Sequence, residues 1–311
     1  MSSICGVDVS KSVLDAYAAD SGVFGQFAND PEGILALAQF CREQAVDLVV
    51  MEATGGYETM AYLVLWQADV ECAIVHAGRV RHHARSMGFL EKTDRIDATV
   101  IASYAAARGV VADTPPNGDQ LRLKALVTRL SQISGDLTIQ KQRLSITVDA
   151  DARASLAEVV ALLKRQARQI EGEIASMIDD DPLWTRLAEA FSSIKGVALR
   201  TMATVLAQLP EIGLISNKEI SKLVGLAPLA NDSGKRKGQR HIHGGRDRVR
   251  TILYLISWIA AKYDASLDRF YQRLIAAGKP KMVARIALAH KVLVRLNAKA
   301  RDAREEMLTT T

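Results

Sequence analysis

The first hundred residues alternate between strand-like and helix-like patterns, and this order constrains the fold more than any other feature of the sequence. Strands are predicted at residues 3–9, 13–19, 23–28, 46–51 and 70–75, and helices from Pro31, after Gly55-Gly56 and over residues 79–108. Three strands, a helix, a strand, a helix, a strand and further helices form the order of an RNase H-like (RuvC-like) α/β fold. A doubly wound α/β fold would also alternate strands and helices, so it remains the alternative.

Two further segments follow the Pro- and Gly-rich stretch at residues 114–118, which is the clearest linker signal in the chain. Residues 121–190 carry apolar residues at helical spacings, which predicts either two helices of a bundle or an antiparallel coiled-coil arm used for oligomerisation. The last third is also helical, and its Gly196 turn suits a helix-hairpin-helix or an ordinary turn between helices. The expected domains are therefore 1–113, 114–190 and 191–311, the last mainly α-helical.

Composition narrows the class of protein. The 311 residues are 49% hydrophobic and 24% charged, as in a globular protein with a substantial core, and the net charge of +5 is compatible with an acidic partner such as a nucleic acid. Three cysteines without CxxC spacing argue against a disulfide framework and against a zinc site, which fits a reducing cytoplasm. We expect no signal peptide, because no basic segment leads into an apolar run at the N-terminus, and no membrane segment, because the most apolar stretch, residues 252–261, is too short to span a bilayer.

Four acidic residues stand where an RNase H-like fold can gather them. Asp8 lies near the end of the first predicted strand, and Glu52 directly follows the buried strand at residues 46–51. A charge after a buried strand is costly unless it is paired or binds a cation. Asp94 and Asp97 are three residues apart, which places both on one face of a helix. Two strand ends and one helix could therefore bring four carboxylates around one point.

Carboxylate oxygens are the ligands that Mg²⁺ prefers in proteins. Two such ions about 3.5–4 Å apart can activate a nucleophile and stabilise the leaving oxygen of a phosphoryl displacement. Each acid also has a structural alternative: Asp94 could cap a helix, Asp97 could form a solvated ion pair and Asp8 could end a strand in a turn. The combination of all four at the expected points of one fold favours the catalytic interpretation.

A second candidate cluster, at residues 225–250, is glycine-rich, polar and densely cationic. Ser233 stands at its head, followed by seven basic residues that we predict to bind nucleic acid: Lys235, Arg236, Lys237, Arg240, Arg246, Arg248 and Arg250. Cations of this kind could hold a scissile phosphate while the serine attacks it. Composition alone favours the simpler alternative, in which Ser233 is a turn residue in a solvated loop. His241 and His243 are candidate acid–base groups or further phosphate contacts.

Taken together, these motifs resemble the insertion-sequence transposases that are guided by a bridge RNA. Members of that family join a DEDD-type, Holliday-junction-resolvase-like domain to a C-terminal transposase domain with a reactive serine. The resemblance spans nearly the whole chain and rests on Gly6–Lys11, Glu52 with Thr54–Tyr57, Lys92–Asp94, Asp97-Ala98, Gly225–Pro228, Ser233-Gly234, Gly238, Ile242, Gly244-Gly245 and Val249-Arg250. Two positions depart from the pattern: Arg246, where asparagine is more frequent, and Ala198, where a second glycine often stands.

The resemblance implies that Asp8, Glu52, Asp94 and Asp97 bind Mg²⁺ and that Ser233 attacks a DNA phosphate to form a transient 5′-phosphoserine link. It also implies donor and target DNA as substrates, a noncoding guide RNA that pairs with both, and a homodimer or homotetramer in the cytoplasm of a bacterium or archaeon, associated with the nucleoid. Sequence choice would then rest on base pairing, while the protein reads backbone and shape. An aromatic content of 5% agrees with binding through the backbone rather than by base stacking.

Three other functions are compatible with parts of the pattern. An actin-like ATPase or sugar kinase shares the RNase H core, and residues 6–9 with Asp15 resemble its first phosphate loop. That alternative requires a second core domain of the same kind, which the sequence does not indicate. A simple junction resolvase would not need Ser233 for cleavage. A non-catalytic nucleic-acid-binding protein would use the basic loop, with the four acids merely structural.

Overall fold

The computed structural model describes residues 3–88, 94–230, 233, 238 and 240–310. The chain divides into two compact units, Met1–Pro116 and Asn117–Thr311, and each is described by itself. Whether residues 114–190 form a domain separate from 191–311 stays a prediction. Among the described residues, no helix is both long enough and apolar enough to cross a membrane.

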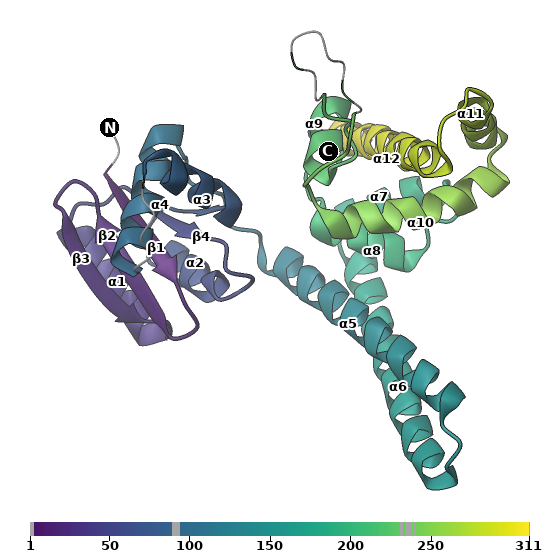
Figure 1. Ribbon diagram of the computed structural model, residues 1–311, viewed down its shortest axis with the longest axis horizontal. Coiled ribbons are helices and arrows are strands. Elements are labelled where there is room, and N and C mark those ends of the chain that lie inside the picture. Colours follow the sequence, from purple (N-terminus) through teal and green to yellow (C-terminus); the bar gives the residue numbers. More distant parts are fainter. Residues whose placement is uncertain (1–2, 89–93, 231–232, 234–237, 239, 311) are drawn as a thin grey trace. The chain divides into compact units, whose positions relative to one another are not determined.

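The first unit contains a five-stranded mixed sheet with the strand order β3-β2-β1-β4-β5 (Figure 1). Its strands are β1 (Ile4–Val9), β2 (Val13–Ala18), β3 (Val23–Ala28), β4 (Leu48–Glu52) and β5 (Cys72–Val75). The first three strands pair antiparallel, and β4 and β5 extend the sheet in parallel from β1. This is the RNase H-like arrangement, so the predicted fold class of the N-terminal part is confirmed.

Helices cover both faces of the sheet, which explains its two apolar surfaces. The helices of this unit are α1 (Pro31–Glu43), α2 (Glu58–Gln67), α3 (Ala77–Ser86) and α4 (Asp94–Arg108). Val7 and Met51 belong to the core formed with α1 and α2, whereas Ile4 and Val50 belong to the core formed with α3 and α4. Because side chains alternate along a strand, the even-numbered residues of β1 and β4 face the α3–α4 side.

The second unit is helical over most of its described part, and Leu229 and His241 form an isolated antiparallel β-bridge. Its helices are α5 (Gly118–Ile146), α6 (Ala150–Asp180), α7 (Pro182–Ser192), α8 (Leu199–Gln208), α9 (Asn217–Val224), α10 (Asp247–Tyr263), α11 (Ala265–Ala276) and α12 (Lys281–Thr310). One continuous core joins these helices, including Phe191 and Leu253, and confirms the prediction of a mainly α-helical C-terminal part.

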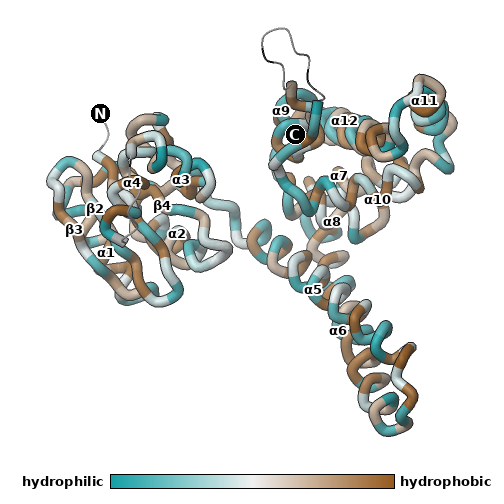
Figure 2. Tube along the Cα trace, in the orientation of Figure 1, coloured by the Kyte–Doolittle hydropathy of each residue, from teal (hydrophilic) through white to brown (hydrophobic). Residues whose placement is uncertain are grey.

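Helices α5 and α6 form a long hairpin (Figure 1). The Asn117 side chain caps the start of α5 and the Asp149 side chain caps the start of α6, each by accepting a backbone N–H bond. The buried stripe of α6 begins at Val160 and Leu163. Figure 2 shows further apolar residues near the hairpin turn, where Val148 is exposed. The hairpin therefore buries one stripe and leaves other apolar side chains at its surface.

In the sequence, helical spacing predicts one apolar stripe formed by Leu156, Val159, Leu162, Leu163 and Ile170. Two of these residues, Val159 and Leu162, are exposed in the structure. The structure instead buries Val160, Leu163 and Ala167, at the spacings of three and four that face a single partner helix. The sequence contains two overlapping apolar stripes here, and periodicity alone does not say which of them faces α5.

Candidate catalytic site

Asp8 and Glu52 occupy the carboxyl ends of two neighbouring strands. β1 and β4 run parallel, and their register ends with Val7 opposite Met51, so the next residue on each strand is one of the two acids. Gly6 and Val50 lie on the α3–α4 side of the sheet. Side chains alternate along a strand, so Asp8 and Glu52, two residues further along, point to the same side. Both are half-buried. The structure therefore places these two predicted site residues next to one another on one face.

Helix α4 brings Asp97 to the same face because Gly6 has no side chain. A Cβ at Gly6 would lie 2.2 Å from the Ala98 carbonyl oxygen and 2.6 Å from the Ala102 nitrogen, so only glycine admits the helix this close. Asp97 is half-buried and lies four residues before Ile101, which is buried against the sheet. Asp94 is the first residue of α4, and its side chain lies outside the described part of the structure.

The carboxylate oxygens of these acids fit a hard divalent cation, but their described side chains are not arranged as a complete coordination site. Asp8, Glu52 and Asp97 each take part in a polar interaction within the protein. Among the described residues, no group of three or more histidine, cysteine, aspartate or glutamate side chains is arranged to hold a metal ion. The strand ends and α4 thus supply carboxylates to one region, and a metal would have to draw them together.

Asp15, which the sequence connects only with the phosphate loop of the ATPase alternative, is a further acid of this region. It lies directly opposite Asp8 in the β1–β2 register and is only 4% exposed. Its Oδ1 accepts a hydrogen bond from Nε2 of Gln26, at 2.8 Å, from the next strand. Opposed residues of an antiparallel pair lie on the same face, so Asp15 also faces α4. Strand alternation after residue 13 could have revealed it.

Glu58 holds the loop that follows Glu52, and it too escaped the sequence analysis. Its Oε2 accepts hydrogen bonds from the Thr54 hydroxyl (2.7 Å), the Thr54 amide (3.2 Å) and the Gly56 amide (2.8 Å). Burial raises the pKa of Glu58, but these hydrogen bonds outweigh it and leave the pKa lowered. Gly55 and Gly56 have φ of 87° and 136°, values that favour glycine. This explains why threonine and two glycines follow Glu52.

The predicted serine loop leaves α9 at Gly225 and returns at Gly244-Gly245, just before α10. The two ends touch: a Cβ at Gly225 would lie 2.1 Å from the Gly244 oxygen, and one at Gly245 would lie 2.3 Å from the Gly225 nitrogen. One step further out, the Leu229 amide donates to the His241 carbonyl at 2.9 Å. The loop is therefore closed at its base.

Ser233 is exposed in the part of the loop beyond that closed base. Residues 231–232, 234–237 and 239 lie outside the described part of the structure, and these include the predicted cations Lys235, Arg236 and Lys237. Arg240, His241 and His243 are exposed. Ser233 and Arg240 are therefore both accessible to solvent.

The glycine contact predicts different effects for two adjacent substitutions. Gly245→Ala should destabilise the protein by more than about 2 kcal/mol, because it adds a Cβ against the backbone of Gly225 to the cost of a positive φ. Gly244→Ala is the matched control: its φ is 65° but nothing lies within 4 Å of the added Cβ, so it should cost only about 1–2 kcal/mol. Urea unfolding measures both, and equal losses would contradict the close contact.

Arg246, Arg248 and Arg250 make contacts within the protein. An Arg250 Nη1 donates to the Gly244 carbonyl, and Arg248 Nη1 donates to the Thr128 hydroxyl on α5 at 2.9 Å. Arg246 forms an ion pair with both carboxylate oxygens of Glu211, at 2.5 and 2.6 Å. Their predicted binding of nucleic acid stays a prediction, but Arg246 and Arg250 also stabilise the base of the loop, and Arg248 connects α10 to α5.

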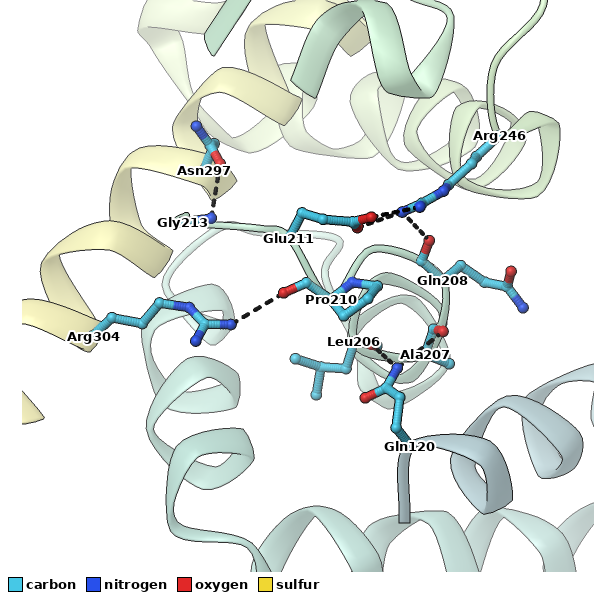
Figure 3. A network of polar contacts seen from close by, with 10 residues as sticks. All are labelled: Gln120, Leu206, Ala207, Gln208, Pro210, Glu211, Gly213, Arg246, Asn297 and Arg304. Atoms are coloured by element: carbon cyan, nitrogen blue, oxygen red, sulfur yellow. Dashed lines mark hydrogen bonds and ion pairs between the residues drawn. The ribbon is translucent and has the colours of Figure 1, made fainter. Parts of the chain in front are cut away.

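Figure 3 shows how Arg246 ties the base of the loop to the end of α8. Its guanidinium also donates to the Gln208 carbonyl, the last of α8, at 2.8 Å, while Gln120 of α5 donates to the carbonyls of Leu206 and Ala207. These side chains satisfy carbonyls that a helix end leaves unpaired. The departure at Arg246 from the family pattern therefore has a structural role in this chain.

Substitution of Arg246 should lower the stability of the protein in addition to removing a positive charge. We expect Arg246→Ala to lower the free energy of unfolding by about 1–3 kcal/mol, because it removes the partner of the half-buried Glu211 carboxylate. Arg240→Ala, an exposed arginine of the same loop, should change it by less than about 0.5 kcal/mol. Thermal unfolding and a double-mutant cycle with Glu211→Ala test this, and additive effects would show that the pair is not coupled.

The same pair predicts a pH dependence. Burial raises the pKa of Glu211, but the hydrogen bonds and charge of Arg246 outweigh it, so the pKa in the folded protein is lowered. The stabilisation is therefore complete above the ordinary carboxylate pKa and is lost as the pH falls through the lowered value. Arg246→Ala should flatten the loss of stability below that range. An unchanged acid profile would contradict the role of the pair.

Family models match both parts of the chain. Residues 5–150 match a transposase model of the DEDD type, and residues 188–272 match the transposase model of the IS116/IS110/IS902 family. Together they span well over half of the 311 residues. The first match covers all four predicted carboxylates, and the second covers Ser233 and the basic loop.

Two curated proteins are similar over nearly the full length. Pilin gene-inverting proteins of Moraxella bovis and Moraxella lacunata are each 24% identical over 303 residues, which cover 93% of this chain and 92% of theirs. Two RuvC structures from Thermus thermophilus, one with a Holliday junction substrate, cover 35% of this chain and 98% of RuvC, with 13% and 14% identity and a TM-score of 0.26. With both halves matched in order along one chain, this protein belongs to the IS116/IS110/IS902 family of transposases and is a DNA-recombining enzyme.

Proposed function

We propose that this transposase cleaves, exchanges and rejoins DNA strands of an insertion sequence, using carboxylates that bind Mg²⁺ and Ser233 as nucleophile. The observation that carries the proposal is the placement of Asp8 and Glu52 at adjacent strand ends, on the face that α4 covers. Acids at the carboxyl ends of neighbouring parallel strands suit the handling of a phosphodiester at one point.

In the proposed reaction, the Ser233 Oγ attacks the scissile phosphorus and loses its proton to a base. The bond from phosphorus to the 3′ oxygen breaks, the 3′ oxygen takes up a proton, and the 5′ end remains attached to Ser233 as a phosphoserine ester. A 3′-hydroxyl from the partner strand then attacks that phosphorus, and the serine hydroxyl is regenerated. Asp8, Glu52, Asp94 and Asp97 would hold Mg²⁺, which supplies charge stabilisation for the phosphoryl transfer when bound.

The closed base of the serine loop supports the proposed role of Ser233. A nucleophile that attacks DNA must reach a large substrate and yet keep its position. Ser233 is exposed, while Gly225, Gly245 and Arg246 fasten the base of its loop. The serine is therefore accessible to a large substrate, while contacts at the base of the loop hold its position.

The guide RNA and the assembly of subunits rest on the motif resemblance. We propose that a noncoding RNA pairs with donor and target DNA, and that a dimer or tetramer brings the acids and the serine to one phosphodiester. Inversion of a DNA segment, which the name of the Moraxella relatives describes, would use the same strand exchange between two sites in one molecule.

The helical second unit argues against the ATPase alternative. That function requires two domains with the RNase H core, and the described part of residues 117–311 consists of helices and isolated bridge residues, without a β-strand. A simple junction resolvase remains the second candidate, because it would use the acids without the serine. Cleavage by a Ser233→Ala variant would favour it.

The proposal is tested by reconstitution. The purified protein, with the RNA that co-purifies with it, should join the two ends of the element to target DNA in MgCl₂, and RNase treatment should abolish joining. Joining that survives complete removal of RNA would refute RNA guidance while leaving a recombinase. ATP hydrolysis without any DNA joining would refute the recombinase itself.

A further inference from the structure

Asn29 lies between the two loops that leave the acidic strand ends. One loop, Ser10–Val13, follows Asp8, and the other, Thr54–Tyr57, follows Glu52. The Asn29 Nδ2 donates to the Ser10 carbonyl at 2.8 Å and to the Tyr57 carbonyl at 3.2 Å. One side chain therefore joins loops that are more than forty residues apart in the sequence.

The position of Asn29 is itself fixed on both sides. Its backbone amide donates to the Ser12 carbonyl at 3.0 Å, which continues the β2–β3 ladder beyond Ala28. On the other side, Gly33 in the first turn of α1 packs so closely on Ala28 that a Cβ there would lie 2.2 Å from the Ala28 oxygen. The residue that bridges the loops is thus held by the sheet and by α1.

The bridge acts where the sheet ladder has ended. The β1–β4 register stops at Val7 and Met51, one residue before Asp8 and Glu52. Glu58 shapes the Thr54–Tyr57 loop, and the Ser10 hydroxyl closes the other turn by bonding to both the amide and the carbonyl of Val13. Those bonds order each loop separately, and the Asn29 amide joins the two loops to each other.

We propose that Asn29 is a positioning residue of the strand-exchange site: it couples the loops after Asp8 and Glu52 and so fixes the spacing of the two carboxylates. This rests on the proposed catalytic roles of those acids. It requires the donor atoms of an amide, because both partners are carbonyl oxygens. Aspartate has the same shape but no donor when ionised, and would repel both carbonyls.

The test compares Asn29→Asp and Asn29→Ala with the control Asn117→Asp. Asn117 caps α5 through its Oδ1, which accepts from the Gln120 amide, and aspartate fills that role equally well. Hydrogen–deuterium exchange of the full-length protein, without DNA, reports both loops. Both Asn29 variants should accelerate exchange about tenfold in residues 10–13 and 53–57 together, with β1 and β4 unchanged.

Two further measurements separate positioning from folding. Glu58→Gln should loosen residues 53–57 alone, and Asn29→Ala should lower kcat for strand exchange about 10–100-fold with an unchanged KM for DNA and an unchanged Tm. The Ala variant decides the matter if the Asp variant does not fold. Hydrogen exchange at the wild-type rate in either loop of the Asn29→Ala variant, or an unchanged kcat for strand exchange, would overturn the proposal. If the wild-type protein exchanges no DNA strands, the proposed function fails, while hydrogen exchange still decides whether Asn29 couples the loops.

Discussion

Ser233→Ala is expected to abolish DNA strand exchange, by at least about 10⁴-fold, while folding and nucleic-acid binding stay intact. The hydroxyl is exposed, so its removal leaves no cavity and no unpaired buried group. The loop base at Gly225 and Gly245 does not involve Ser233, and the thermal midpoint should not move. Strand exchange on labelled donor and target DNA measures the first effect, and a gel-shift titration measures binding.

Ser192→Ala is the matched control for that variant. The Ser192 hydroxyl is also exposed and donates to the Glu189 carbonyl of its own helix, so its loss should leave strand exchange unchanged. Strand exchange by Ser233→Ala at even a tenth of the wild-type rate would exclude Ser233 as nucleophile. Retained cleavage without rejoining would instead support the junction-resolvase alternative.

Asp8→Asn is expected to reduce strand cleavage by at least about 10³-fold, because it removes a charged oxygen from the proposed metal site at the end of β1. The folded protein should be as stable as the wild type or more stable. Asp8 stands directly opposite the buried Asp15, and like charges across a strand pair destabilise the sheet. Cleavage rates in MgCl₂ and thermal unfolding without metal test the two parts.

Asp20→Asn provides the control for charge alone. Asp20 lies exposed in the turn between β2 and β3, so the same substitution there should change neither cleavage nor Tm appreciably. A large fall in Tm for Asp8→Asn would mean that the carboxylate is structural. Wild-type cleavage by that variant would remove Asp8 from the site.

The sequence predicted the parts of the fold that depend on local pattern. Alternating apolar residues gave β2 and β3, a continuous apolar run gave β4, and Pro31 marked the start of α1. Asp8 and Glu52 could be selected from the sequence because each is an acidic residue at the end of an apolar strand pattern. Their adjacency then followed from the strand order, which the structure confirms.

The supporting residues of the site could not be predicted in the same way. Asn29 follows a strand and precedes a helix cap, so in sequence it looks like an ordinary turn residue, and its partners lie 19 and 28 residues away. Glu58 looks like a first-turn helix acid. In sequence, Arg246 is one of a run of basic residues, and its partner Glu211 lies 35 residues earlier. Such contacts depend on strand register and on the packing of helices, which the local sequence pattern does not determine.

The identity of the residue that becomes attached to DNA decides whether Ser233 is the nucleophile. Wild-type protein is incubated with its RNA and a cleavable DNA substrate, quenched in denaturant and digested, and the modified peptide is sequenced by mass spectrometry. We expect a 5′-phosphodeoxynucleotide on Ser233, with no adduct in Ser233→Ala. A covalent adduct on a different residue, or complete strand exchange with no adduct at any time, would exclude Ser233 as the nucleophile.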